Sequence, residues 1–185
     1  GRSKVEAEQR VLDLHDRPLV IRTGAFFGPW DLANFVSAVV STLARGEPFF
    51  APSEQVVSPT YVPDLVNATL DLLIDGERGV WHLTNEQPIA WDALARLTAT
   101  MTHLDAGLVA GRSFAALGMR APRPRYSALL SRHGPRLPTL EDALGRFVAE
   151  CEHRPWESPS GRSTCGVCGG TTDASDGHGR CGIHR

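Results

Sequence analysis

The clearest hydrophobic pattern in this chain predicts a helix that follows Asp31. Apolar residues recur there with the three- and four-residue spacing of a single helix face, at Leu32, Phe35, Val36, Val39, Val40 and Leu43. Asp31 is its expected N-cap, and Gly46 is expected to end it. The same periodicity predicts further amphipathic helices over residues 3–14, 65–73, 91–101 and 140–148.

Short apolar runs between these helices predict strands. The best defined is 19–22, and further extended pieces are expected at 49–50, 55–57 and 80–83. Much of 105–137 is rich in Pro, Arg and Gly and is expected to be irregular. Strands that alternate with helices indicate an α/β fold. A sheet with so few strands leaves open edges, so we expect an architecture that is incomplete by itself.

The loop after the strand at 19–22 is the first candidate for function. In α/β proteins ligands bind where the carboxyl ends of parallel strands open into loops, and Arg22 to Trp30 form such a segment. The glycine-rich strand-turn-helix of a dinucleotide-binding sheet is absent before this loop. We therefore expect the chain to be the back part of an enzyme whose front part is missing.

Composition narrows the class of protein. The chain has 185 residues, of which 42% are hydrophobic and 22% charged, which is typical of a soluble globular protein. A formal charge of −2 gives no reason to expect nucleic acid or an anionic membrane as a partner. Its apolar runs are shorter than the ~20 residues of a membrane span, and its polar first residues do not form a signal peptide. A cytoplasmic location is expected.

Several sequence blocks that span roughly 1–150 follow one another at 1–4, 19–23, 27–28, 34–36, 55–65, 123–129 and 137–144. Together and in this order they resemble the extended short-chain dehydrogenase/reductases, and among these the dTDP-4-dehydrorhamnose reductase family. The resemblance implies the C-terminal part of an NAD(P)-binding Rossmann-type fold, with a small substrate-binding subdomain and an incomplete sheet. It implies NAD(P)H-dependent reduction of the 4-keto group of a nucleotide-activated deoxysugar. The expected partners are this nucleotide sugar and either a second copy of the chain or the missing N-terminal half.

The resemblance makes Lys4 a catalytic and cofactor-binding residue. In this family a Tyr lies four residues before such a Lys on one helix, and that position falls immediately before Gly1. A carbonyl that accepts hydride needs a proton donor, and a nearby ammonium favours phenolate. The chain without its Tyr is expected to be inactive. Taken alone, Lys4 would be an ordinary exposed lysine of a helix.

The other cofactor-binding candidates are Thr23, Gly24 and Ala25. The resemblance implies that this loop touches the nicotinamide mainly through its backbone; the alternative is an ordinary strand end. Many relatives carry Ser-Trp where Gly24 and Ala25 stand. The change removes an aromatic wall for a sugar or base.

Four residues are candidates for substrate binding. Asn34 is expected either to bond sugar-phosphate groups or to cap a helix. Gln55 and Ser58 are expected either to line the substrate side or to form a turn and helix entry. Arg125 suits a diphosphate because a guanidinium forks onto phosphate oxygens, although the neighbouring arginines also fit a solvated surface.

The tail, 151–185, is treated as a second unit. Its paired ligand spacing predicts a structural zinc site formed by Cys165, Cys168, Cys181 and His184. The composition also fits a disordered linker or translation out of frame. Two other functions therefore stay open beside the reductase: a non-catalytic sugar-nucleotide-binding protein, and a zinc-binding interaction module on the tail.

Overall fold

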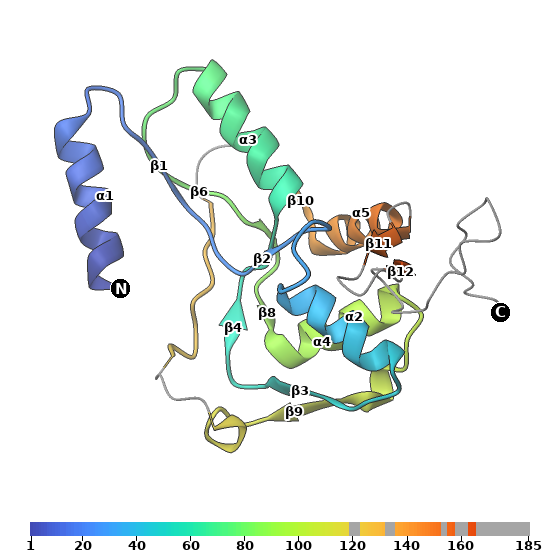
Figure 1. Cartoon of the computed structure of the whole chain (residues 1–185). Helices are drawn as coiled ribbons and strands as arrows, with labels where there is room; N and C mark the ends of the chain where they lie inside the picture. The colour runs from blue at the N-terminus through green and yellow to red at the C-terminus, as the bar shows by residue number, and fades with distance from the viewer. Residues whose placement is uncertain (119–122, 132–135, 153–154, 158–162, 166–185) are drawn as a thin grey trace.

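A parallel strand pair lies at the N-terminal side of the fold (Figure 1). In this computed structural model, which describes residues 1–118, 123–131, 136–152, 155–157 and 163–165, β1 (Leu19–Arg22) pairs with β6 (Gly79–His82). The helix α1 (Arg2–Leu14) packs beside β1, and α3 (Val62–Ile74) lies on the connection that leads to β6. These elements confirm the helices and strands predicted around the candidate loop.

Two further parallel pairs and one antiparallel pair are formed by strands β2 to β5, β8 and β9. The strand β2 (Phe26–Phe27) pairs in parallel with β5 (Thr60–Tyr61), and β3 (Phe49–Pro52) pairs in parallel with β9 (Val109–Arg112). The antiparallel pair joins β4 (Val56–Val57) and β8 (Ile89–Ala90).

The last two pairs are β7 (Asn85–Glu86) with β10 (Leu137–Thr139), in parallel, and β11 (Pro155–Glu157) with β12 (Ser163–Cys165), antiparallel. Every strand of the described residues thus belongs to a two-stranded pair. The expected α/β class with an incomplete sheet is confirmed. No helix within these described ranges is long and apolar enough to span a membrane.

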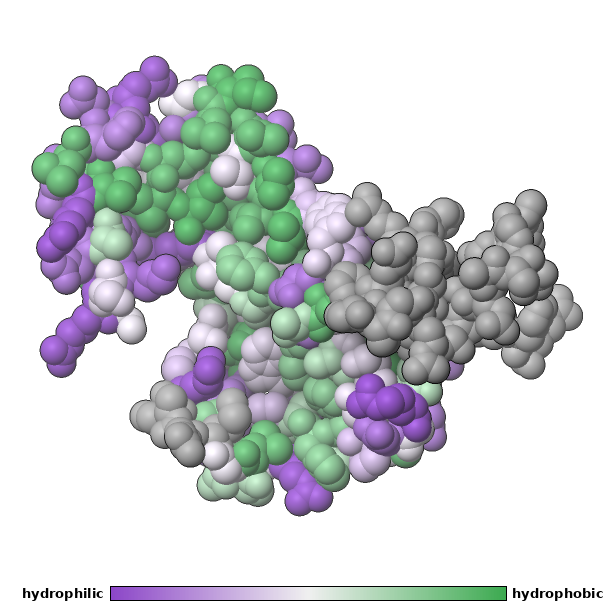
Figure 2. All heavy atoms as spheres, in the orientation of Figure 1, coloured by the Kyte–Doolittle hydropathy of each residue, from purple (hydrophilic) through white to green (hydrophobic). Residues whose placement is uncertain are grey.

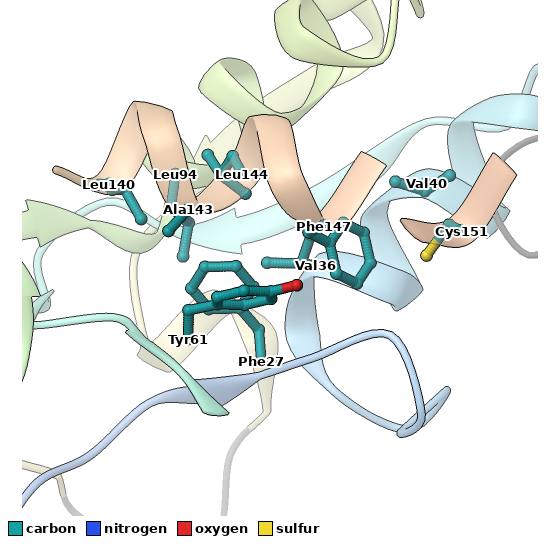
Figure 3. Close-up of a cluster of buried hydrophobic side chains, with 10 residues drawn as sticks. All are labelled: Phe27, Val36, Val40, Tyr61, Leu94, Leu140, Ala143, Leu144, Phe147 and Cys151. Carbon is teal, nitrogen blue, oxygen red and sulfur yellow. The ribbon is translucent and has the colours of Figure 1, made fainter. Parts of the chain in front are cut away.

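Three helices enclose the main hydrophobic core. They are α2 (Phe35–Ala44), α4 (Trp91–Met101) and α5 (Leu140–Glu152), and the apolar face predicted for each points inward. Figure 3 shows the ring of Phe27 beside those of Tyr61 and Phe147, with ring centroids 5.2 Å and 6.0 Å apart. The cluster comprises Phe27, Val36, Val40, Tyr61, Leu94, Leu140, Ala143, Leu144, Phe147 and Cys151. Packing of β2 and β5 against α5 anchors the far end of the candidate loop.

A buried polar network joins α3 to α5. The Asp64 carboxylate accepts hydrogen bonds from both terminal nitrogens of Arg146 and from the amide of Asn85. The Asn85 amide oxygen in turn accepts from the Tyr61 backbone N–H, at 2.7 Å. Asp64 and Asn85 are both buried, and these bonds satisfy polar groups that would otherwise be costly to remove from water.

Two sequence predictions need correction. The helix expected after Asp31 begins at Phe35, and its N-cap is Asn34, whose side-chain oxygen accepts from the Ser37 N–H. Asp31 instead accepts from the Ala33 N–H in the preceding turn. The region 105–137 is less irregular than expected, since it contains β9 and short 3-10 helices at Ala106–Leu108 and Ala115–Leu117. The division of the chain into units 1–150 and 151–185 stays a prediction.

The outer face of α3 is apolar. Val66, Leu70, Leu73 and Ile74 are spaced on one side of this helix, and each is about half exposed or more. Figure 2 shows hydrophobic residues gathered over this part of the surface. Burial of Ala68 and Leu72 on the opposite side attaches the helix to the strands.

Candidate functional site

The loop that follows β1 is held in place by β5. The Thr23 hydroxyl donates to that of Thr60 at 3.2 Å, and the Thr60 backbone N–H donates to the Ala25 carbonyl at 3.1 Å. Immediately afterwards Phe26 pairs with Thr60 and Phe27 with Tyr61. Because Thr60 and Tyr61 are fully buried, the loop between β1 and β2 has a fixed backbone path.

Ala25 has a left-handed backbone conformation, with φ of +49°. A residue with a side chain adopts this conformation at a cost of roughly 1–2 kcal/mol, so it persists only where neighbouring contacts hold it. At Gly24, by contrast, an added Cβ would meet open space. The strained residue thus lies in the segment that the sequence predicts to contact a cofactor.

A groove of about 600 Å³ runs between α1 and β1 and reaches this loop. Both Lys4 and Thr23 line it, which brings together the catalytic candidate and one of the three candidate residues of the loop. Gly24 and Ala25 directly follow Thr23 in the chain but do not line the groove. Its remaining walls are Ala7, Glu8, Val11, Leu19, Val20, Ile21, Arg22 and Phe26.

An ion pair crosses the groove from helix to strand. The Arg22 Nε donates to Glu8 Oε2 at 2.9 Å, and a second hydrogen bond joins Arg22 Nη2 to Glu8 Oε1. This contact lowers the pKa of the Glu8 carboxyl and raises that of the Arg22 guanidinium. Sequence reasoning missed the pair, although Glu8 lies one helical turn after Lys4 and Arg22 directly precedes Thr23. The pair fixes α1 against the strand that leads into the loop.

The substrate candidate Asn34 is engaged by its own chain. Its amide nitrogen donates to the Gly28 carbonyl at 3.1 Å and to the Ser37 hydroxyl at 3.0 Å, while its oxygen caps α2. Asn34 is also buried. These contacts fit the helix-capping alternative, and a role in binding sugar-phosphate groups stays a prediction.

The other three substrate candidates lie along one seam, where residues 55–58 contact residues 125–129. Ser58 is buried, and its hydroxyl donates to the Leu129 carbonyl and accepts from the Leu129 N–H, each at 3.1 Å. Beside it the Val56 N–H donates to the Arg125 carbonyl at 2.8 Å. Gln55 is buried, and its carbonyl accepts from Trp91. The structure thus brings residues 55–58 and the segment around Arg125 together.

This seam continues to the strand pair. Thr84 donates its hydroxyl hydrogen to the Leu129 carbonyl, and the His82 ring lies 3.1 Å from the Leu130 carbonyl. His82 ends β6, the partner of β1. The Arg125 side chain is 80% exposed and 3.5 Å from Glu54, a weak contact that leaves its guanidinium accessible to an anion.

Most of the predicted zinc site lies outside the described residues. Cys168, Cys181 and His184 fall there, whereas Cys165 is described only as the last residue of β12. Within the part of the chain that the structure does describe, His, Cys, Asp and Glu form no cluster of three or more that could hold a metal ion. The zinc site stays a prediction.

Comparison with known families defines the class of this chain. The RmlD substrate binding domain matches residues 1–152, and the chain belongs to this family. It is 38% identical over 134 residues to the dTDP-4-dehydrorhamnose reductase of Mycobacterium tuberculosis, covering 71% of this chain and 44% of that protein. A probable low-salt glycan biosynthesis reductase of Haloferax volcanii is 30% identical over 158 residues, covering 80% of this chain and 53% of that protein.

Solved structures show a similar fold. The dTDP-4-dehydrorhamnose reductase of Bacillus anthracis, in complex with NADP, has a TM-score of 0.74 and 28% identity, covering 80% of this chain and 54% of that chain. A Clostridium acetobutylicum reductase of the same name also has a TM-score of 0.74, at 23% identity, covering 81% of this chain and 54% of that chain. The chain spans about half the length of the curated relatives it matches.

Proposed function

We propose that this chain forms the substrate-binding part of an NAD(P)H-dependent reductase that acts on the 4-keto group of a nucleotide-activated deoxysugar. The observation that carries the proposal is the groove that both Lys4 and Thr23 line, at the carboxyl end of a parallel strand in a chain of the RmlD family. Ligands of open α/β sheets bind at such ends.

The residues present fit a nicotinamide cofactor. Gly24 has no side chain, and an added Cβ there would meet open space, so the backbone of this loop can approach a flat ring closely. When bound, the nicotinamide would supply hydride to the sugar carbonyl. Lys4 would hold the nicotinamide ribose and favour release of a phenolic proton to the developing alkoxide. The family resemblance assigns that phenol to a Tyr immediately before Gly1, so we propose that the 185-residue chain binds substrate without reducing it.

The nucleotide would lie toward the seam between 55–58 and 125–129. Arg125 would pair with a diphosphate, since its guanidinium is exposed and has only one long contact. Gln55, Ser58 and the Asn34 region would shape the sugar side. Ser58 fixes the path of this wall because its hydroxyl holds both polar backbone groups of Leu129.

Two measurements test this function. The 185-residue chain should bind dTDP-rhamnose more tightly than dTDP by saturation-transfer NMR. A chimera in which the front half of the Mycobacterium tuberculosis reductase precedes Gly1 should oxidise NADPH when given dTDP-4-dehydrorhamnose. A folded chain that binds neither dTDP nor dTDP-rhamnose would refute the proposal. Substrate binding with an inactive, folded chimera would instead identify a sugar-nucleotide-binding protein without catalysis.

A further inference from the structure

The two phenylalanines of β2 have opposite environments. Phe27 is 2% exposed and belongs to the main core, whereas Phe26 is 51% exposed. Side chains alternate between the two faces of a strand, so burial of Phe27 directs Phe26 to the other face. The parallel pairing of Phe26 with Thr60 then holds its backbone in place.

Phe26 lines the groove that also contains Lys4 and Thr23. Of the described residues that line this groove, it alone carries an aromatic ring. Ala25, the residue before it, carries only a methyl group. The aromatic surface at this end of β1 is therefore provided by the next residue along the chain.

We propose that Phe26 determines sugar specificity by packing against the methyl group at C6 of a 6-deoxysugar. This inference rests on the proposed function and deepens it. A half-exposed aromatic ring gains free energy when an apolar group displaces water from its face. A hydroxyl at C6 would lose part of its hydration against the same ring, at a cost in free energy that the methyl group does not carry. Phe26 thus distinguishes the methyl from the hydroxymethyl form.

The test compares dTDP-6-deoxyglucose with dTDP-glucose, which differ only by the hydroxyl at C6. Binding of each to the 185-residue chain is measured for the natural sequence, Phe26→Ala, Phe26→Leu and the control Phe50→Ala. Phe50 is a matched control because it is also a strand phenylalanine, 44% exposed, and does not line the groove. Circular dichroism confirms that each variant is folded.

We expect the natural chain and Phe50→Ala to prefer the 6-deoxy form by roughly tenfold, the effect of one apolar contact in a binding pocket. Phe26→Ala should bring the two affinities close to equality, and Phe26→Leu should retain part of the preference. In the natural chain, saturation of aromatic protons should transfer to the C6 methyl. That transfer should vanish in Phe26→Ala and persist in Phe50→Ala.

Two results overturn the inference while leaving the proposed function intact. One is an unchanged preference in Phe26→Ala. The other is an equal loss of affinity for both sugars, which would mean that Phe26 contacts the nucleotide or the shared part of the sugar. If the natural chain binds neither sugar nor dTDP, the proposed function fails and this inference fails with it.

Discussion

Arg146 donates hydrogen bonds from both of its terminal nitrogens to the carboxylate of Asp64, at 2.6 and 2.8 Å. The two residues are 82 positions apart in the sequence. The Asp64 side chain is 6% exposed, whereas that of Arg146 is 38% exposed. The guanidinium also lies over the ring of Tyr61, with its carbon 5.0 Å from the ring centroid. One side chain therefore couples the start of α3 to the middle of α5.

Replacing Arg146 by Met should destabilise the chain because it leaves the Asp64 carboxylate buried without its cation. Breaking a fully buried pair costs about 3–5 kcal/mol, and the partial exposure of Arg146 reduces the expected loss to about 2–3 kcal/mol. Urea unfolding measures the change. Arg45→Met, which breaks the exposed contact with Glu47, should change stability far less. Equal losses in the two variants would contradict the coupling.

The phenol of Tyr61 should make stability fall at alkaline pH. Burial and the nearby carboxylate of Glu150 raise its pKa above the ordinary value of 10.0. Above pH 10 the unfolded chain releases this proton while the native chain retains it, so the contribution is present at lower pH and is lost as pH rises. Tyr61→Phe removes this titration. The difference in unfolding free energy between the natural chain and Tyr61→Phe should therefore shift between pH 8 and 11 in favour of the variant.

Asn34→Ala should reduce stability by about 1–2 kcal/mol because α2 loses its N-cap. The variant also removes the hydrogen bonds to Gly28 and Ser37. Thermal or urea unfolding provides the measurement, with Asp31→Ala as the control that removes one exposed turn contact. If Asn34→Ala were as stable as the natural chain and lost only dTDP-sugar affinity, Asn34 would be a ligand-binding residue in place of a cap.

Lys4→Met should abolish most of the reductase activity of the chimera while leaving its fold unchanged. Lys4 is exposed on α1, so its loss should alter stability by less than about 0.5 kcal/mol. A group that assists proton transfer contributes about 10²–10⁴ to the rate. NADPH oxidation is measured at saturating substrate, with Arg2→Met on the same exposed helix as the control. Similar activity in both variants would remove Lys4 from the reaction.

Local patterns predicted the elements whose formation depends on their own residues. The helix at Trp91–Met101 has the predicted bounds, since the apolar face that forms it recurs within its own residues. The strand β9 was missed because Val109–Arg112 becomes a strand only by pairing with β3, about sixty residues away. A run of four residues containing Gly111 gives no periodicity of its own.

The sequence also predicted only part of the candidate site. Lys4 and Thr23 could be placed at one site from family resemblance, and the structure brings both to one groove. The sequence did not predict the ion pair between Glu8 and Arg22, because each residue alone resembles an ordinary charged residue of the surface. The sequence left open whether Asn34 caps a helix or binds sugar-phosphate groups, since a capping role depends on where the helix begins.

The apolar stripe of α3 has a consequence for handling this chain in solution. Val66, Leu70, Leu73 and Ile74 together place a broad hydrophobic face in water. Such surfaces promote self-association, and salts excluded from protein surfaces strengthen that tendency. Light scattering of the 185-residue chain should therefore increase with protein concentration and with added sulfate, and binding experiments belong in dilute, low-sulfate buffer.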